Sequence, residues 1–281
     1  MWSSEAVTVA YGLASAAAWG AGDFGGGLAT RRSSARGVIL FSQLIGVGLL
    51  FALMGFMPQP ALLPIDLLYG VLAGICGSLG LVGLYTALSR SRMGVVAPVA
   101  AVVTAVIPLT VGFFLEGAPP VQQGGGFVLA LLAVWLLSRS SAGFNVTPKE
   151  LLLPAAAGVG FGLFFILIDR VTAGALLWPL IAARLGSIVI MTIWSLARRP
   201  FTAPSWRQLP LIALAGIGDT GGNAFFALAA QAGRLDIASV LASLYPAATV
   251  MLAWLVLKER LGLKQWLGVA MAIVALLLIA L

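Results

Sequence analysis

Residues 37–57 read GVILFSQLIGVGLLFALMGFM, an apolar stretch without a single charged side chain. A helix needs about 20 apolar residues to cross the roughly 30 Å hydrocarbon core of a bilayer, and this stretch is long enough. The composition extends the pattern to the whole chain, because 61% of its 281 residues are hydrophobic and only 9% are charged. Soluble domains carry about 25% charged residues. The sequence therefore predicts an integral membrane protein with the lipid bilayer as its surroundings.

Ten such stretches follow one another, each bounded by charged, proline or polar residues. Hydrocarbon offers the backbone no hydrogen-bond partners, and the stretches lack the alternation of a membrane β-barrel, so each is predicted to be a helix. The predicted fold class is an all-α polytopic membrane protein with ten transmembrane helices. Their ranges are 7–29, 37–57, 67–88, 93–115, 123–138, 151–173, 177–197, 208–230, 236–257 and 264–281.

The composition also excludes several kinds of site. The chain has no histidine, and Cys76 is its single cysteine, so it can build neither a His/Cys metal site nor an intrachain disulfide. Catalytic triads that use histidine are excluded as well. The 16 basic residues are spread in short clusters between apolar stretches, which indicates topology signals and not a nucleic-acid surface. We expect no metal, no cofactor and no nucleic-acid partner.

The basic residues are distributed unevenly between the two sides of the membrane. The loops after the odd-numbered predicted spans hold most of them, whereas the opposite loops hold only Arg170 and Arg234. Because cytoplasmic loops carry an excess of Lys and Arg, the odd-numbered loops are predicted to be cytoplasmic and both termini extracytoplasmic. We expect the protein in a bacterial inner (plasma) membrane.

An internal repeat divides the chain into two halves of five predicted spans. Residues 1–138 form the first repeat, 139–150 a connecting loop, and 151–281 the second repeat. An odd number of spans inverts the second half relative to the first, which is the inverted-repeat plan of secondary transporters. The repeat matches 12–23 with 158–169, Leu-Ala-Gly-Ile at 72–75 with the same tetrapeptide at 214–217, and Glu116 and Gln122 with Glu259 and Gln265.

Three motifs resemble a known family. They are AWGAGDF at 18–24, SVLASLYP at 239–246, and LKERL at 257–261 leading into Gly268. Together they resemble the EamA-like, ten-helix branch of the drug/metabolite transporter superfamily. The resemblance implies a basket of two inverted five-helix halves that exports small metabolites, often amino acids, through a central cavity.

Asp219 is the leading candidate for a functional residue. An ionisable side chain inside a span costs at least about 2.5 kcal/mol, so its presence indicates a partner, a wet cavity or a function. Asn223 and Phe226 follow at i+4 and i+7 and share its helix face. Substrate binding or proton coupling is one interpretation, and a hydrogen bond to a neighbouring helix is the other. We favour the first, because transporters bind substrates near the bilayer midplane.

Asp23 shares a helix face with Trp19 and is the second candidate for substrate binding or coupling. The alternative interpretation is a helix-end charge that reaches the interface or pairs with Arg31. Its repeat mate Asp169 lies beside a basic residue, and its simpler interpretation is a marker of the membrane surface.

Arg184 lies inside a span with no loop nearby in sequence. Three roles are open for its side chain: an ion pair with Asp169, bidentate binding of a substrate carboxylate, or snorkelling to the interface.

Deep aromatic residues and prolines complete the candidates. The aromatic set could line a cavity or pack between helices, and it comprises Trp19, Tyr85, Phe164, Phe165, Phe225, Phe226 and Tyr245. Prolines inside spans remove amide donors and permit bends, which makes Pro98, Pro108 and Pro246 candidate hinges, with static kinks as the alternative.

These features predict a secondary transporter, not an enzyme, that exports a small organic metabolite by alternating access around a central cavity. We expect amino acids or related compounds as substrates, with organic cations or drugs as the alternative and a channel or an intramembrane enzyme as weaker ones. The chain has no nucleotide motif, so a solute gradient or protons must drive transport. We expect a functional monomer.

Overall fold

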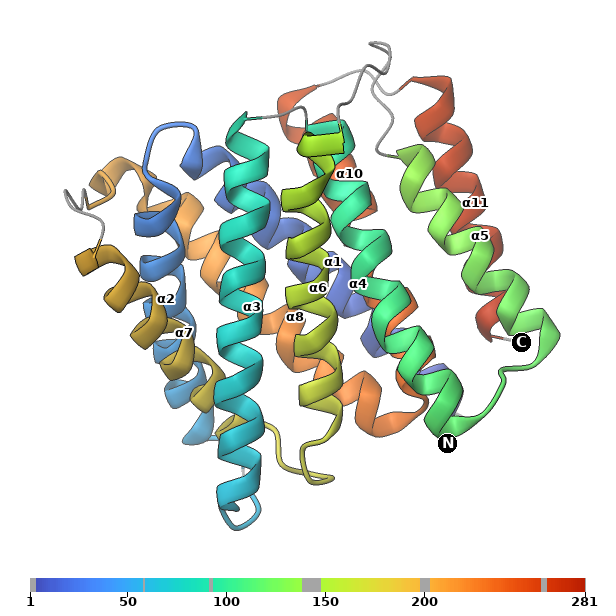
Figure 1. Ribbon diagram of the computed structural model, residues 1–281, viewed down its shortest axis with the longest axis horizontal. Helices are drawn as coiled ribbons and strands as arrows, with labels where there is room; N and C mark the ends of the chain where they lie inside the picture. The colour runs from blue at the N-terminus through green and yellow to red at the C-terminus, as the bar shows by residue number, and fades with distance from the viewer. Residues whose placement is uncertain are drawn as a thin grey trace.

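The computed structural model describes residues 4–57, 59–90, 93–137, 148–197, 203–258 and 262–280 (Figure 1). These residues form helices and connecting loops with no strand among them, which confirms the all-α fold class. The helices are α1 (Ser4–Thr30), α2 (Ala35–Met54), α3 (Pro64–Arg90), α4 (Met93–Glu116), α5 (Val121–Leu137), α6 (Pro148–Asp169), α7 (Leu177–Ala197), η1 (Trp206–Gln208), α8 (Leu209–Ala232), α9 (Leu235–Ala242), α10 (Tyr245–Leu257) and α11 (Leu263–Ala280).

The membrane character predicted from the composition agrees with the length and surface of these helices. Six segments are long and apolar enough to cross a bilayer: Ala35–Met54, Pro64–Ala87, Leu152–Asp169, Leu177–Ala197, Trp206–Ala232 and Leu235–Val256. Large apolar side chains cover the outside, as at Phe56, Phe114 and Leu152, which are 85%, 79% and 68% exposed. Such a surface suits lipid and not water. The protein is an integral membrane protein, and the count of ten spans stays a prediction.

The predicted ninth span is not one continuous helix, and this boundary differs from the sequence prediction. It consists of α9 and α10, separated by a turn at Ser243 and Leu244. Pro246 has no amide hydrogen, so it cannot donate to the carbonyl four residues earlier, and α9 ends at that residue, Ala242. The Ser243 hydroxyl donates to the carbonyl of Ser239 at 2.7 Å, which stabilises the end of α9. The helix of this predicted span is therefore interrupted between Ala242 and Tyr245, inside the bundle.

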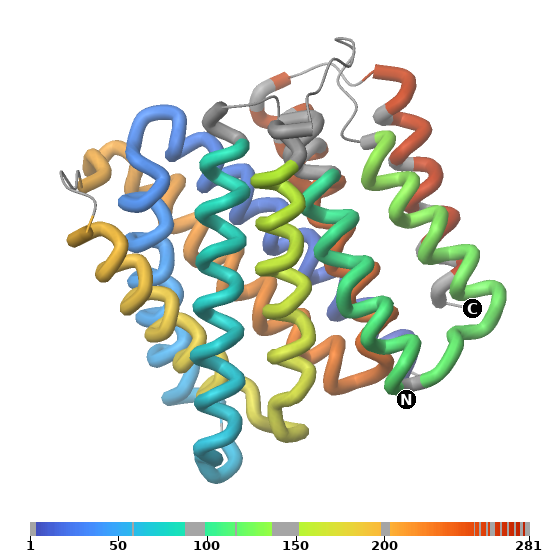
Figure 2. The backbone as a smooth tube through the Cα atoms, viewed as in Figure 1, coloured from blue at the N-terminus to red at the C-terminus, as the bar shows by residue number. Residues whose placement is uncertain are grey.

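Helices that are distant in sequence pack along one another. Helix α1 lies along α8, α3 lies between α6 and α7, and α5 lies along α11. Figure 1 shows α5 and α11 together at the right of the bundle and α2 and α7 together at the left. The backbone trace in Figure 2 shows both termini at the lower right, whereas the connection from α1 to α2 lies at the upper left.

Glycine permits close approaches of this kind, as where α1 packs on α8. A Cβ atom on Gly218 would lie 2.6 Å from both the carbonyl oxygen of Ala18 and the amide nitrogen of Gly22. Membrane helices associate through such small residues, because lipid gives them no hydrophobic driving force. This crossing brings the middle of α1 against the middle of α8, and it places Asp23 and Asp219 on adjacent helices.

We expect Gly218→Ala to destabilise the protein by about 1 to 3 kcal/mol, because the new methyl group has no room between the two backbones. The matched control is Gly48→Ala in α2, where an added Cβ meets nothing within 4 Å. This control is expected to gain about 0.5 to 1 kcal/mol from helix propensity. Thermal unfolding in detergent compares the two, and equal midpoints would contradict the tight crossing.

Candidate functional site

A cavity lies in the middle of the bundle. Its volume is about 600 Å³, counting the space at its mouth. Helices from both halves of the chain line it, namely α1, α2, α3, α4, α6, α7, α8 and α10. Its polar lining consists of Asp23, Gln43, Ser78, Thr104, Arg184, Ser187, Asp219, Asn223 and Tyr245, and its aromatic lining includes Trp19, Phe161, Phe164 and Phe165.

Arg184, Asp219 and Gln43 form a hydrogen-bonded cluster in the wall of the cavity. The Arg184 Nη1 atom donates to Asp219 Oδ2 and, at 2.5 Å, to Gln43 Oε1. The Gln43 amide also donates to Asp219 Oδ2 at 3.3 Å. The cluster joins α7, α8 and α2. A buried guanidinium is stable in an apolar interior only with such a partner, and here the partner is also held by a neutral amide.

The ion pair predicted between Arg184 and Asp169 is wrong. Asp169 is the last residue of α6 and half-buried, whereas Arg184 pairs with Asp219. The sequence suggested the wrong carboxylate because Asp169 lies on the preceding hairpin. The packing of the helices determines the partner instead. Helix α2 packs on both α7 and α8, and its Gln43 forms hydrogen bonds with Arg184 and with Asp219.

The cluster has two buried polar atoms without a hydrogen-bond partner among the described residues. They are Arg184 Nη2 and the hydroxyl of Thr220. Gly46 of α2 lies beside both side chains, because a Cβ atom there would meet the Thr220 hydroxyl and lie 3.3 Å from Arg184 Nε. A donor and a hydroxyl left in this state can accommodate a small polar group such as water.

Asp23 also lines the cavity, as its candidacy requires. It is half-buried and makes no hydrogen bond or ion pair within the described part of the chain, so the alternative pairing with Arg31 is not observed. Tyr245 lines the same cavity. Among the described residues, the cavity therefore holds two carboxylates, and Asp219 alone of these has a cationic partner.

The aromatic candidates form a stacked group that crosses three helices. Trp19 of α1 stacks on Phe165 of α6 with ring centroids 5.3 Å apart, and its indole N–H donates to Asn223 Oδ1 at 2.9 Å. Phe164 meets Trp19 edge-on at 6.4 Å. Phe226 lies behind this wall: it is fully buried, stacks on Phe165 at 4.0 Å, and is not among the lining residues. The expectation that Phe226 contacts the substrate directly is thus corrected: Phe226 packs behind Phe165 and supports it.

The remaining aromatic candidates separate into two groups. Tyr245 begins α10 and lines the cavity with a buried hydroxyl that has no partner among the described residues. Tyr85 is buried against Gly26 of α1 and is not a lining residue. Phe225 is 36% exposed and stacks on Tyr11, away from the cavity.

The candidate hinges differ in their positions. Pro246 lies at the start of α10, directly after the break that follows α9. Pro98 and Pro108 lie within α4, which continues through both, and the side chain of Pro98 is outside the described part. A hinge role stays a prediction for all three prolines. Of the three, Pro246 is the one that lies next to an interruption of its helix.

Sequence reasoning missed the hydroxyl-bearing residues of the lining. Ser78 and Thr104 donate to carbonyls one turn earlier in their own helices, at 2.6 and 2.8 Å, and Ser187 of α7 donates to Gly74 of α3 at 2.9 Å. The sequence contained one signal for them. Ser78 and Thr220 both carry a hydroxyl group, and they are separated by the same number of residues as the two Leu-Ala-Gly-Ile tetrapeptides of the repeat.

Removal of one member of the ion pair is expected to destabilise the protein more than removal of both. Asp219→Asn leaves a buried guanidinium without a counter-ion, which costs about 3 to 5 kcal/mol, and adding Arg184→Gln should recover much of that loss. The free energy of unfolding in mixed micelles measures this cycle. The control is Asp169→Asn with and without Arg184→Gln, where no recovery is expected. Recovery with Asp169 but not with Asp219 would refute the pairing.

Comparisons with known proteins agree with this architecture. A solved structure whose title reads "Crystal structure of protein" superposes with a TM-score of 0.81 over 98% of both chains at 16% identity, which shows a shared fold. No curated protein matches the chain. Residues 148–281 match the EamA-like transporter family, a family of membrane transporters of small solutes. This match covers just under half of the chain, and it agrees with the family that the sequence motifs resemble.

Proposed function

We propose that the protein is a secondary transporter that exports a small organic solute by alternating access around the central cavity. One observation carries the proposal: the charged and aromatic lining comes from helices of both halves of the chain and meets in one cavity. A cavity built in this way can change its accessible side when one half moves against the other. Without a nucleotide motif, a solute gradient or protons would supply the energy.

The pairing of the helices supports two inverted five-helix repeats at 1–138 and 151–281. The sequence repeat relates α1 to α6 and α3 to α8. In the structure α1 packs along α8, and α6 packs along α3, so the two contacts exchange under the repeat. A pseudo-two-fold axis would produce this exchange. Counting α9 and α10 as one interrupted span, the proposal has ten spans in a functional monomer.

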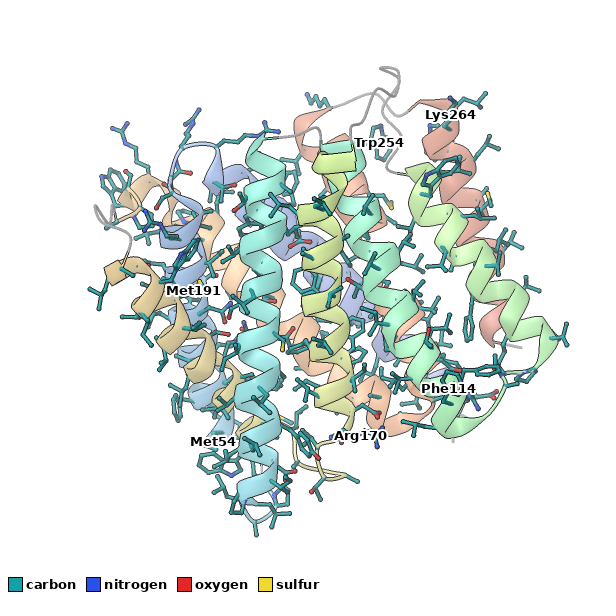
Figure 3. All side chains as sticks on the ribbon, in the orientation of Figure 1. Met54, Phe114, Arg170, Met191, Trp254 and Lys264 are labelled. Atoms are coloured by element: carbon teal, nitrogen blue, oxygen red, sulfur yellow. The ribbon has the colours of Figure 1, made fainter. Side chains whose placement is uncertain are left out.

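The distribution of basic residues supports an orientation with both termini outside the cytoplasm. Arg170 and Lys264 lie at opposite ends of the bundle in Figure 3, with Lys264 at the upper end. The connection between α1 and α2, which holds Arg31 and Arg32, lies at this same end in Figure 2. The upper end would then face the cytoplasm of a bacterial cell.

We expect a C-terminal alkaline phosphatase fusion to be active in the bacterial inner membrane and a C-terminal green fluorescent protein fusion to be dark. Phosphatase folds only outside the cytoplasm, where its disulfides form, whereas the fluorescent protein requires the cytoplasm. A fusion after residue 203 is the control, because that loop is predicted to be cytoplasmic and should give the reverse result. The opposite pattern would refute the orientation and leave the repeat untouched.

Transport itself is tested by saturable counterflow in proteoliposomes. The probe solutes are phenylalanine and 2-phenylethylammonium, which represent the amino-acid and the organic-cation alternatives. Gly77→Leu is expected to abolish counterflow of the accepted solute, because Gly77 lines the cavity and its new side chain would fill it beside Phe164. Gly48→Leu is the control, since Gly48 faces open space. Linear, non-saturable flux would indicate a channel instead.

A further inference from the structure

We infer that the cavity selects organic monocations with an aromatic or apolar body, and that Asp23 is the counter-ion of the bound cation. The inference rests on the proposed transport function, since it names the class of solute that the same cavity accepts. It reverses the order of the two substrate classes that the sequence suggests.

The charges of the lining determine this preference. Three charged side chains line the cavity within the described residues: Asp23, Asp219 and Arg184. Arg184 and Asp219 neutralise each other in their ion pair, so Asp23 sets the net charge of the lining, which is −1 when its carboxyl group is ionised. A cation entering the cavity makes the sum of charges zero, whereas a zwitterion leaves it negative and an anion doubles the imbalance.

The geometry of the ion pair turns its negative member toward the cavity. The side chain of Arg184 is 4% exposed, whereas that of Asp219 is 21% exposed. A substrate carboxylate would have to displace Asp219 from Nη1 or reach Nη2, which is buried. Either approach brings the carboxylate against Asp219. The cluster is therefore a poor carboxylate site, although it contains an arginine.

Asp23 carries an unfavourable free energy that a cation would relieve. It is a half-buried carboxylate inside the bundle with no hydrogen bond or ion pair to another described residue. Unpaired carboxylates in an apolar interior are strongly disfavoured, and a bound ammonium group supplies the missing counter-charge. The other carboxylate, Asp219, is already paired, so the relief is available at one position.

The wall beside Asp23 suits the rest of such a ligand. Trp19 precedes Asp23 by one helical turn on the same face, and it stacks on Phe165 with Phe164 edge-on. Aromatic rings attract cations through their electron-rich faces and pack against apolar bodies. The indole N–H of Trp19 is held by Asn223, which orients the ring. Charge and shape thus point to one ligand class.

The experiment compares phenylalanine with two analogues, each of which keeps one of its two charged groups. Equilibrium binding of 2-phenylethylammonium, phenylalanine and 3-phenylpropionate is measured on purified protein in lipid nanodiscs. These probes share the phenylethyl body and differ in the charged groups that it carries: an ammonium group, both an ammonium and a carboxylate group, or a carboxylate group. We expect 2-phenylethylammonium to bind at least about tenfold more tightly than phenylalanine, and 3-phenylpropionate to bind most weakly. Tighter binding of phenylalanine, or no binding of the amine, would overturn the inference.

Two substitutions assign the charge that the cation meets. Asp23→Asn is expected to weaken binding of 2-phenylethylammonium at least about tenfold, because it removes the counter-ion. Glu5→Gln removes an exposed carboxylate from the same helix outside the cavity and is the matched control. Arg184→Gln should tighten binding of the amine, because it leaves a second carboxylate unpaired, and size-exclusion chromatography verifies that each variant is folded. A loss of amine binding in folded Arg184→Gln would overturn the assignment.

The binding and counterflow experiments distinguish a failure of the cation selectivity from a failure of the transport function. A protein that binds the amine but shows no counterflow of any probe contradicts the transport function and leaves the charge selectivity standing. Saturable counterflow of phenylalanine without binding of 2-phenylethylammonium would have the opposite meaning, because the transporter would be confirmed and the cation selectivity refuted.

Discussion

The ion pair between Arg184 and Asp219 is the interaction on which the centre of this protein depends. A guanidinium on a side chain that is only 4% exposed, in a bundle surrounded by lipid, requires a counter-ion, and that counter-ion comes from a different helix. The amide of Gln43 bonds to both members, so α2, α7 and α8 are joined at one point. The same contact sets the charge of the cavity. In our proposal, a structural requirement of folding in lipid and the selectivity for the solute are therefore coupled through one pair of residues.

The helix crossings that position this pair depend on small residues. Gly22 and Gly218 allow α1 and α8 to touch through their backbones, and Gly46 makes room for Arg184 and Thr220 beside α2. Because the apolar side chains have no preference between lipid and protein, close packing at these points supplies the specificity of association. The high glycine content of the sequence thus allows the helices that line the cavity to pack closely enough to bring their polar side chains together.

The break between α9 and α10 gives the bundle its one interrupted span in the described part of the chain. Pro246 removes an amide donor, and the turn before it leaves Tyr245 at the edge of the cavity with its hydroxyl buried and unpartnered among the described residues. Broken helices at the membrane midplane are tolerated where the freed backbone groups face protein or a cavity. The interruption therefore fits a solute pathway better than a purely structural bundle.

The sequence by itself determined the fold class, the approximate ranges of most helices and part of the cavity lining, because hydrophobicity, proline position and buried charge act locally along the chain. It identified Asp23, Asp219, Arg184 and Trp19 as candidates, and each of them reaches the cavity. It could not decide which carboxylate pairs with Arg184, nor that Phe226 lies behind Phe165 and Tyr85 against Gly26. Those outcomes depend on the relative rotation and crossing of helices that are distant in sequence, and helical periodicity within one span carries no information about its neighbour. Only the tertiary structure decided that Arg184 is neutralised by Asp219 and that Asp23 faces the cavity without a partner among the described residues.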